Sequence, residues 1–199
     1  MNEIEKYLKS MVDEQKILMP KINPIHGYRS LFDFVLRHGL SFTPSPRPKS
    51  IPLGAIKSCF QNAANLAMDH DLIYCEGYAA HLIPLSHAWC VDKHGKVIDN
   101  TWRTLAPEYF GIPFRTEYLR RSLLKNGCYG LIDAWWKGFP LLKDKPKLWL
   151  NDSLRQTARV VSGHNKRTDN NENAGRQVRS GSGNHEPANC ERAKKANRV

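Results

Sequence analysis

The sequence predicts an α+β domain, in which a helix that carries a cysteine packs on an antiparallel sheet, followed by a disordered basic tail. Segments with apolar residues at helical spacing come before segments with strand-like composition, an order typical of the α+β class. Every aromatic residue lies at or before Trp149, and 41% of the 199 residues are hydrophobic. About the first 150 residues are therefore expected to form the packed domain.

Two helices and a proline-rich connection are expected at the N-terminus. Residues 1–19 carry apolar side chains at helical spacing, and Pro20 ends this pattern. Residues 28–38 are predicted to form a second, shorter helix. Residues 42–52 contain four prolines, which favour an extended connection with few backbone donors. Residues 1–52 are thus predicted to form an N-terminal unit of helices and connection.

The next helix is expected over residues 59–70, where one face is apolar. Ser58 and Gln61 have the spacing of a capping box, in which the two residues satisfy backbone N–H groups at the helix start. This places Cys59 in the first turn, where unpaired N–H groups and the helix dipole favour a negative charge.

Three strands are expected to follow, over residues 72–82, 87–91 and 97–102, with the polar turn 92–96 joining the last two. Side chains alternate between the faces of a strand, so the length of the turn decides which face Asp99 occupies.

A five-residue turn pairs Val91 with Val97 and puts His87 and Asp99 on one face of the hairpin, within side-chain reach. A two-residue turn would instead pair Asp99 with Cys90 and send it to the opposite face. The sequence therefore makes a testable statement about the register of this hairpin.

The remaining segments are expected to complete the domain and to continue beyond it. A helix over residues 115–124 and an apolar segment over residues 131–142 are predicted to cover the sheet or the site. Residues 53–150 are predicted to be the core of the domain. Residues 151–199 lack aromatic residues and are rich in Asn, Gly, Ser and Arg, which predicts a disordered tail.

The composition limits the partners and the compartment. The formal net charge is +11, spread over domain and tail, which permits contact with nucleic acid through the basic tail although no motif supports it. No run of 18 apolar residues exists, so no membrane partner is expected, and the N-terminus lacks the apolar stretch of a secretory signal. Five cysteines without CxxC spacing favour reduced thiols and a cytoplasmic location.

Three residues together indicate nucleophilic chemistry: Cys59, His87 and Asp99. A cysteine is a good nucleophile only as the thiolate, which a helix start and a neighbouring imidazolium both stabilise. A carboxylate on the far ring nitrogen would orient the imidazole and stabilise its charged form.

The residues around these three resemble the transglutaminase-like branch of the papain-like cysteine enzymes. That family has a helix-borne Cys, a Gly-Tyr strand, a His-Ala-Trp block and an Asp-Pro-Thr-Trp block. The matching segments here are Cys59, Glu76-Gly77-Tyr78, His87-Ala88-Trp89 and Asp99-Asn100-Thr101-Trp102. The start of the cysteine helix is also similar to that of small bacterial and phage proteins with a Cys-Phe-x-Asn-Ala sequence. Asn100 stands where the family has proline, and Lys57-Ser58 replaces a Gly-x lead.

The resemblance implies a papain-like catalytic core and a thiol hydrolase, such as a thiol protease, or an acyltransferase. Cys59 would be the nucleophile, His87 the general base and then acid, and Asp99 the orienting carboxylate. The reaction would pass through a thioester, needs no cofactor, and would act on a protein, peptide or small amide. The alternative is a catalytically inactive binding module of the same fold, which recruits a protein or nucleic acid with help from the basic tail.

Five other residues near Cys59, His87 and Asp99 can each be interpreted in two ways. Gln61 and Asn62 are either residues of the helix start or groups that orient the site and its oxyanion. Trp89, Trp102 and Tyr78 either belong to the core or line a substrate cleft.

Cys59 itself could be a buried small residue, as most cysteines without a disulfide are. A zinc site from His87, Cys90, His94 and Cys128 is disfavoured, because strand alternation sends His87 and Cys90 to opposite faces.

Overall fold

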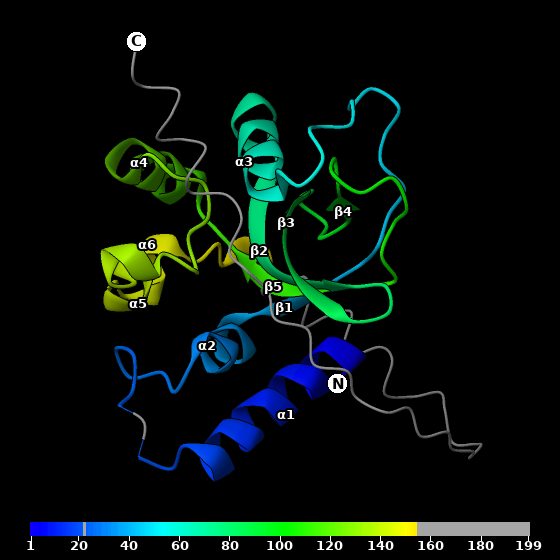
Figure 1. Ribbon diagram of the computed structural model, residues 1–199. Helices are drawn as coiled ribbons and strands as arrows, with labels where there is room; N and C mark the ends of the chain where they lie inside the picture. Colours follow the sequence, from blue (N-terminus) through cyan, green and yellow to red (C-terminus); the bar gives the residue numbers. More distant parts are fainter. Residues whose placement is uncertain (22, 155–199) are drawn as a thin grey trace, which may run out of the picture.

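A five-stranded antiparallel sheet forms the centre of the domain in the computed structural model, which describes residues 1–21 and 23–154 (Figure 1). Its spatial order is β1-β5-β2-β3-β4, and every neighbouring pair is antiparallel. The strands are β1 (Leu40–Phe42), β2 (Ile73–Ala80), β3 (Pro84–Val91), β4 (Val97–Ile98) and β5 (Glu108–Pro113). The predicted α+β class is confirmed.

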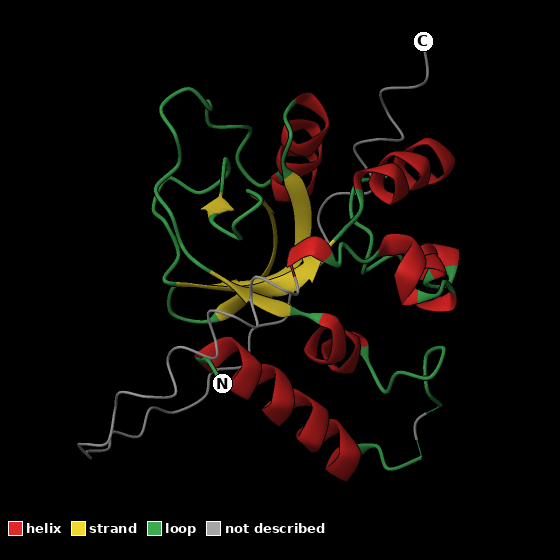
Figure 2. Ribbon diagram, turned by 180° about the vertical axis from the view of Figure 1, so that it is seen from behind, coloured by secondary structure: helices red, strands yellow, loops and turns green. Residues whose placement is uncertain are grey.

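The helices pack against different parts of this sheet (Figure 2). Helices α1 (Glu3–Leu18) and α2 (Leu31–His38) contact β5, whereas α3 (Cys59–Asp69) contacts β3 and β2. The C-terminal part contributes a 3-10 turn (Trp135–Lys137) and three helices, which are α4 (Thr116–Asn126), α5 (Pro140–Lys143) and α6 (Pro146–Trp149). Among the residues that the structure describes, no helix has the length and apolar character needed to cross a membrane.

Local signals explain where the helices begin. The side chain of Asn2 accepts from the backbone N–H of Glu5, and Glu5 reciprocates, which forms a capping box at the start of α1. Helix α2 begins at Leu31 rather than at residue 28, because Ser30 caps it. The capping box expected at Ser58 was wrong: its side chain makes no capping hydrogen bond to α3.

The hairpin β3–β4 has the register that the five-residue turn predicts. Val91 pairs with Val97 and Cys90 with Ile98. The side chain of Asp92 accepts from the backbone N–H groups of residues 94 and 96 at 2.8 and 2.9 Å, and so shapes the turn. Strand β4 is shorter than the expected segment 97–102, because the chain turns at Asp99.

The two faces of the sheet carry separate apolar clusters, as alternation along β2 requires. Tyr74 belongs to the larger cluster, with α1, α2 and α3, and Cys75 belongs to the smaller one, with Trp89 and Tyr109. The smaller cluster also includes Leu154, which is only 2% exposed.

The packed part of the chain therefore extends past the boundary expected after residue 150. The disorder expected of residues 155–199 lies outside the described residues, as does Cys190.

Candidate active site

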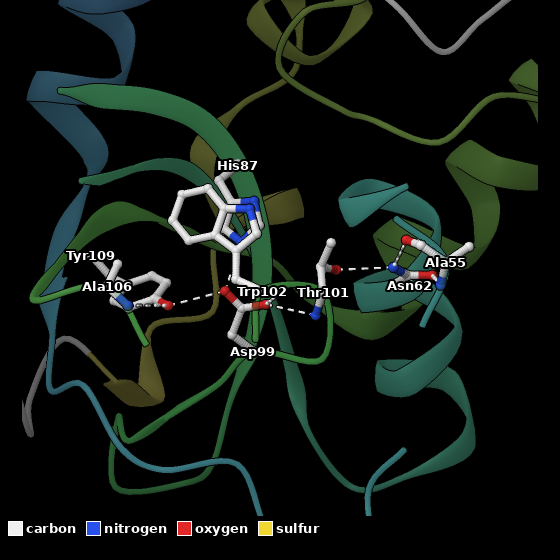
Figure 3. Close-up of polar contacts among 8 residues, drawn as sticks. All are labelled: Ala55, Asn62, His87, Asp99, Thr101, Trp102, Ala106 and Tyr109. Atoms are coloured by element: carbon white, nitrogen blue, oxygen red, sulfur yellow. Dashed lines mark hydrogen bonds and ion pairs between the residues drawn. The ribbon is translucent and has the colours of Figure 1, made fainter. Parts of the chain in front are cut away.

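Three elements bring Cys59, His87 and Asp99 to one place. Cys59 is the first residue of α3, His87 lies in the middle of β3, and Asp99 directly follows β4. Figure 3 shows the polar contacts around His87 and Asp99, whose Nε2 and Oδ2 atoms lie 2.8 Å apart. The confirmed register of the hairpin is what puts these two side chains on the same face.

The side chain of Cys59 is half-buried, and its thiol lies close enough to His87 to raise the pKa of that ring. Since Asp99 occupies Nε2, the ring nitrogen that remains for the thiol is Nδ1. Because Ser58 provides no side-chain cap, its side chain does not occupy the backbone N–H groups of the first turn of α3. The thiol thus lies between an imidazole and the positive end of a helix.

His87 is almost completely buried, with 1% of its surface exposed. Its ring stacks on Trp102, with centroids 4.0 Å apart and planes 17° apart. Burial alone lowers the pKa of His87, but the hydrogen bonds and charges of Asp99 and Cys59 outweigh it and raise the pKa to about 9. The imidazolium is therefore the favoured form of this ring near neutral pH.

Asp99 accepts four hydrogen bonds. Its Oδ2 accepts one hydrogen bond from the His87 ring and one, at 3.0 Å, from the hydroxyl of Tyr109. Its Oδ1 accepts hydrogen bonds from the backbone N–H groups of Thr101 at 2.8 Å and Trp102 at 3.2 Å. Burial raises the pKa of Asp99, but these donors and the charge of His87 lower it by more, so the carboxyl stays ionised.

Asn62 ties the helix of Cys59 to the loops beside it. Its amide oxygen accepts from the backbone of Ala55 at 3.1 Å, and its amide nitrogen donates to the carbonyl of Ala55 at 2.8 Å and to Thr101 Oγ1 at 3.0 Å. These contacts occupy the amide, so Asn62 orients the surroundings of the site. Gln61, in the first turn of α3, is exposed.

The three aromatic residues expected to pack in the core or to line a cleft lie in different environments. Trp102 is half-buried and covers the ring of His87. Trp89 is fully buried and packs on Phe42 and Tyr109, which makes it a core residue and not a cleft residue.

Tyr78 follows Gly77, the cross-strand partner of His87, so its side chain leaves the sheet on the other face. There it packs on Phe32 of α2, with ring centroids 6.0 Å apart. The structure therefore does not bring Tyr78 to His87.

Sequence reasoning missed Tyr109, whose hydroxyl donates to Asp99 and accepts from the backbone of Ala106 at 3.3 Å. Tyr109 lies in β5, which pairs with β1 and β2 across long stretches of chain. No local spacing relates Tyr109 to Asp99, so a sequence pattern offered no signal for this contact.

The four cysteines in the described part of the chain form no disulfide. Cys75 and Cys90 are buried, which raises the pKa of both thiols, and Cys90 Sγ contacts the carbonyl of Ala63 at 3.1 Å. Within residues 1–21 and 23–154, no three His, Cys, Asp or Glu side chains converge as metal ligands would.

The chain matches no protein-family model, no curated protein and no solved structure.

Proposed function

We propose that this protein is a cysteine-dependent hydrolase of amides or peptides, or an acyltransferase, with a papain-like core of the transglutaminase type. The observation that carries this proposal is that one buried imidazole is hydrogen-bonded to a carboxylate and has, close to it, a thiol at a helix start that raises its pKa. That arrangement suits a thiolate–imidazolium pair, which is the reactive form of cysteine nucleophiles.

In the first half of the reaction, the thiolate of Cys59 attacks the carbonyl carbon of the substrate and forms a C–S bond. The carbonyl π electrons move to oxygen, and backbone N–H groups at the start of α3 stabilise the oxyanion. The C–N bond then breaks, and the amine leaves with the proton of the His87 imidazolium. The acyl group stays on sulfur as a thioester.

In the second half, the neutral imidazole of His87 takes a proton from water or from an acceptor amine, which attacks the thioester carbon. The C–S bond breaks, and the thiolate is restored beside the imidazolium. Asp99 keeps the ring oriented in both halves and stabilises its charge, without giving up or taking the proton itself.

Labelling with iodoacetamide near pH 7, followed by mass spectrometry of the peptides, tests this proposal. Cys59 should react much faster than Cys128, which is similarly half-buried, and the buried Cys75 and Cys90 should react slowest. His87→Ala should remove the advantage of Cys59 over Cys128, because the imidazolium partner is then gone.

An amide-hydrolysis screen with the wild type and the Cys59→Ala variant distinguishes an enzyme from an inactive binding module. A reactive Cys59 without any turnover of amides, peptides or acyl donors would favour the binding module. Equal labelling of Cys59 and Cys128 in the native protein would contradict the triad itself.

A further inference from the structure

Glu76 is a second buried carboxylate close to the candidate site, and the reaction above does not use it. It lies in β2 with 1% of its surface exposed. Its Oε1 accepts from the hydroxyl of Tyr74 at 2.6 Å and from the backbone N–H of Leu131 at 2.5 Å. Its Oε2 accepts from the backbone N–H of Ile132 at 3.0 Å. All of these contacts use the carboxyl as an acceptor.

The segment that Glu76 holds, residues 128–133, lies against the helix of Cys59. A Cβ on Gly130 would lie 3.7 Å from the ring of Phe60, the residue that follows Cys59. The hydroxyl of Tyr129 contacts Asn65 Oδ1 at 3.4 Å, one turn further along α3. Leu131 is buried in the cluster against which Phe60 packs. The segment therefore borders the first two turns of α3.

We propose that Glu76 is a positioning residue whose carboxyl holds residues 128–133 in place beside the start of α3, where they form one wall of the substrate site at Cys59. The inference rests on the proposed function, since a wall matters only where Cys59 receives a substrate. It assigns to this wall the selection of the substrate by size. A tight wall admits a slender acyl group and excludes a bulky one, whereas a loosened wall admits both.

The charge of the carboxyl decides how firmly the wall is held. An ionised carboxyl only accepts, which suits three converging donors, whereas a protonated one carries a hydrogen that competes with them. Burial raises the pKa of Glu76 to about 7, although the bonds from Tyr74, Ile132 and Leu131 lower it, and the charge of Asp133 adds to the increase. Three thiols are further ionisable groups near this cluster: Cys59 and Cys90 interact through their charges with Tyr74, and Cys75 interacts with Glu76 itself. The wall should therefore tighten as the pH rises through about 7.

Amide hydrogen exchange at Leu131 and Ile132 measures the wall without any substrate. After correction for intrinsic exchange, protection of both amides in the wild type should increase from pH 6 to pH 8. Glu76→Gln keeps the size of the side chain but cannot ionise, so exchange at pH 8 should be faster by about tenfold or more and lose this pH dependence. Asp144→Asn is the matched control, because it changes a carboxylate that accepts from Tyr118 in another part of the domain and removes none of the three hydrogen bonds to Glu76. It should keep the increase in protection.

The rates at which Cys59 reacts with iodoacetamide and with a bulky maleimide measure how far the wall limits access to the thiol. Both reagents need the same thiolate, so the ratio of the bulky rate to the small one reports access and not activation. The ratio should rise at least about threefold in Glu76→Gln and stay unchanged in Asp144→Asn. Tyr74→Phe, which removes one donor only, should give a smaller rise and serves if Glu76→Gln does not fold.

The outcomes separate this proposal from the proposed function. A reactive Cys59 whose ratio is unchanged in Glu76→Gln and in Tyr74→Phe would overturn the wall and leave the triad intact. A Cys59 that is inert to both reagents in the wild type would overturn the proposed function and the wall together. Unchanged protection of Leu131 and Ile132 in Glu76→Gln would show that the carboxyl does not hold the segment.

Discussion

Asn62 donates a hydrogen bond to Thr101 Oγ1 at 3.0 Å, and this contact links the helix of Cys59 to the turn that presents Asp99. Asn62 lies one turn along α3 from Cys59, and Thr101 lies two residues after Asp99. The backbone carbonyl of Asn62 also accepts from the side chain of Asn100 at 3.3 Å. The positions of Cys59 and Asp99 are therefore linked by hydrogen bonds between neighbouring residues, which neither of the two side chains makes itself.

Asn62→Ala should destabilise the domain and slow the alkylation of Cys59 together. The substitution removes three hydrogen bonds of a buried amide, which corresponds to a loss of about 2–3 kcal/mol. Urea unfolding and the rate of iodoacetamide labelling measure the two effects. Gln61→Ala, at the neighbouring exposed position of the same helix, should change neither by much. A similar response of both variants would mean that the contact with Thr101 does not organise the site.

Tyr109→Phe should weaken the hold on Asp99 while leaving the ring packed in the core. The lost hydroxyl leaves the backbone N–H of Ala106 without this acceptor and Asp99 with one donor fewer, at a cost of about 1–2 kcal/mol. Asp99 then stabilises the imidazolium differently, so the pKa of His87 should change measurably in an NMR titration.

Tyr118→Phe is the matched control, because Tyr118 also donates to a carboxylate, Asp144, at 3.0 Å, but in another part of the domain. It should lower stability without changing the titration of His87. An unchanged pKa of His87 in both variants would show that the hydroxyl of Tyr109 does not influence His87 through Asp99.

The ring of His87 should titrate well above its ordinary value of 6.5, at about 9. A histidine whose pKa is raised in the folded state stabilises the fold fully below pH 6.5, and this contribution is lost as the pH rises through about 9. Unfolding free energies of the wild type and of His87→Gln, measured between pH 6 and pH 9.5, report this contribution with both partners of the ring in place. Their difference should shrink with increasing pH; a constant difference would contradict the raised pKa.

Leu154→Ala should lower the stability of the whole domain by about 2–5 kcal/mol, because the side chain is 2% exposed in the cluster around Trp89. The composition of residues 155–199 predicts that removing them changes the melting temperature little. A chain that ends at residue 152 should instead melt at a clearly lower temperature. Equal melting temperatures for chains ending at 152 and at 154 would show that Leu154 contributes nothing.

The sequence predicted the parts of the site that depend on local spacing. Apolar periodicity predicted the helix that carries Cys59, and the shared face of His87 and Asp99 follows from the length of one turn. The capping box at Ser58 failed because its spacing is common, and the conformation of the backbone decides whether the bond forms.

Contacts between distant segments could not be predicted in this way. Glu76 meets Leu131 across 55 positions of the chain, and Leu154 enters a cluster formed by strands far before it. Such contacts depend on the strand order of the sheet, which places β5 between β1 and β2. A single sequence carries no local pattern that sets this order, so the contacts of Tyr109 and Glu76 escaped prediction, whereas Asn62, one helical turn from Cys59, did not.

Asp99→Asn and Asp99→Ala should separate orientation of His87 from stabilisation of its charge. The amide of Asn can still accept a hydrogen bond from the ring, so Asp99→Asn keeps the orientation but loses the negative charge. Asp99→Ala loses both, and leaves a buried ring N–H and the backbone donors of Thr101 and Trp102 without this partner. Both variants should fold, with Asp99→Ala the less stable.

The rate of Cys59 alkylation as a function of pH is the measurement that decides between these effects. In the proposed triad the imidazolium should keep the thiol reactive at low pH, because Asp99 helps to hold the proton on His87. Without the carboxylate, His87 loses its proton more readily, so the rise in alkylation rate should move to higher pH. The displacement should be moderate in Asp99→Asn and larger in Asp99→Ala, where the ring is also free to rotate. Three superimposable profiles would show that Asp99 is not coupled to the thiol. Cys59 and His87 would then act as a pair without the carboxylate.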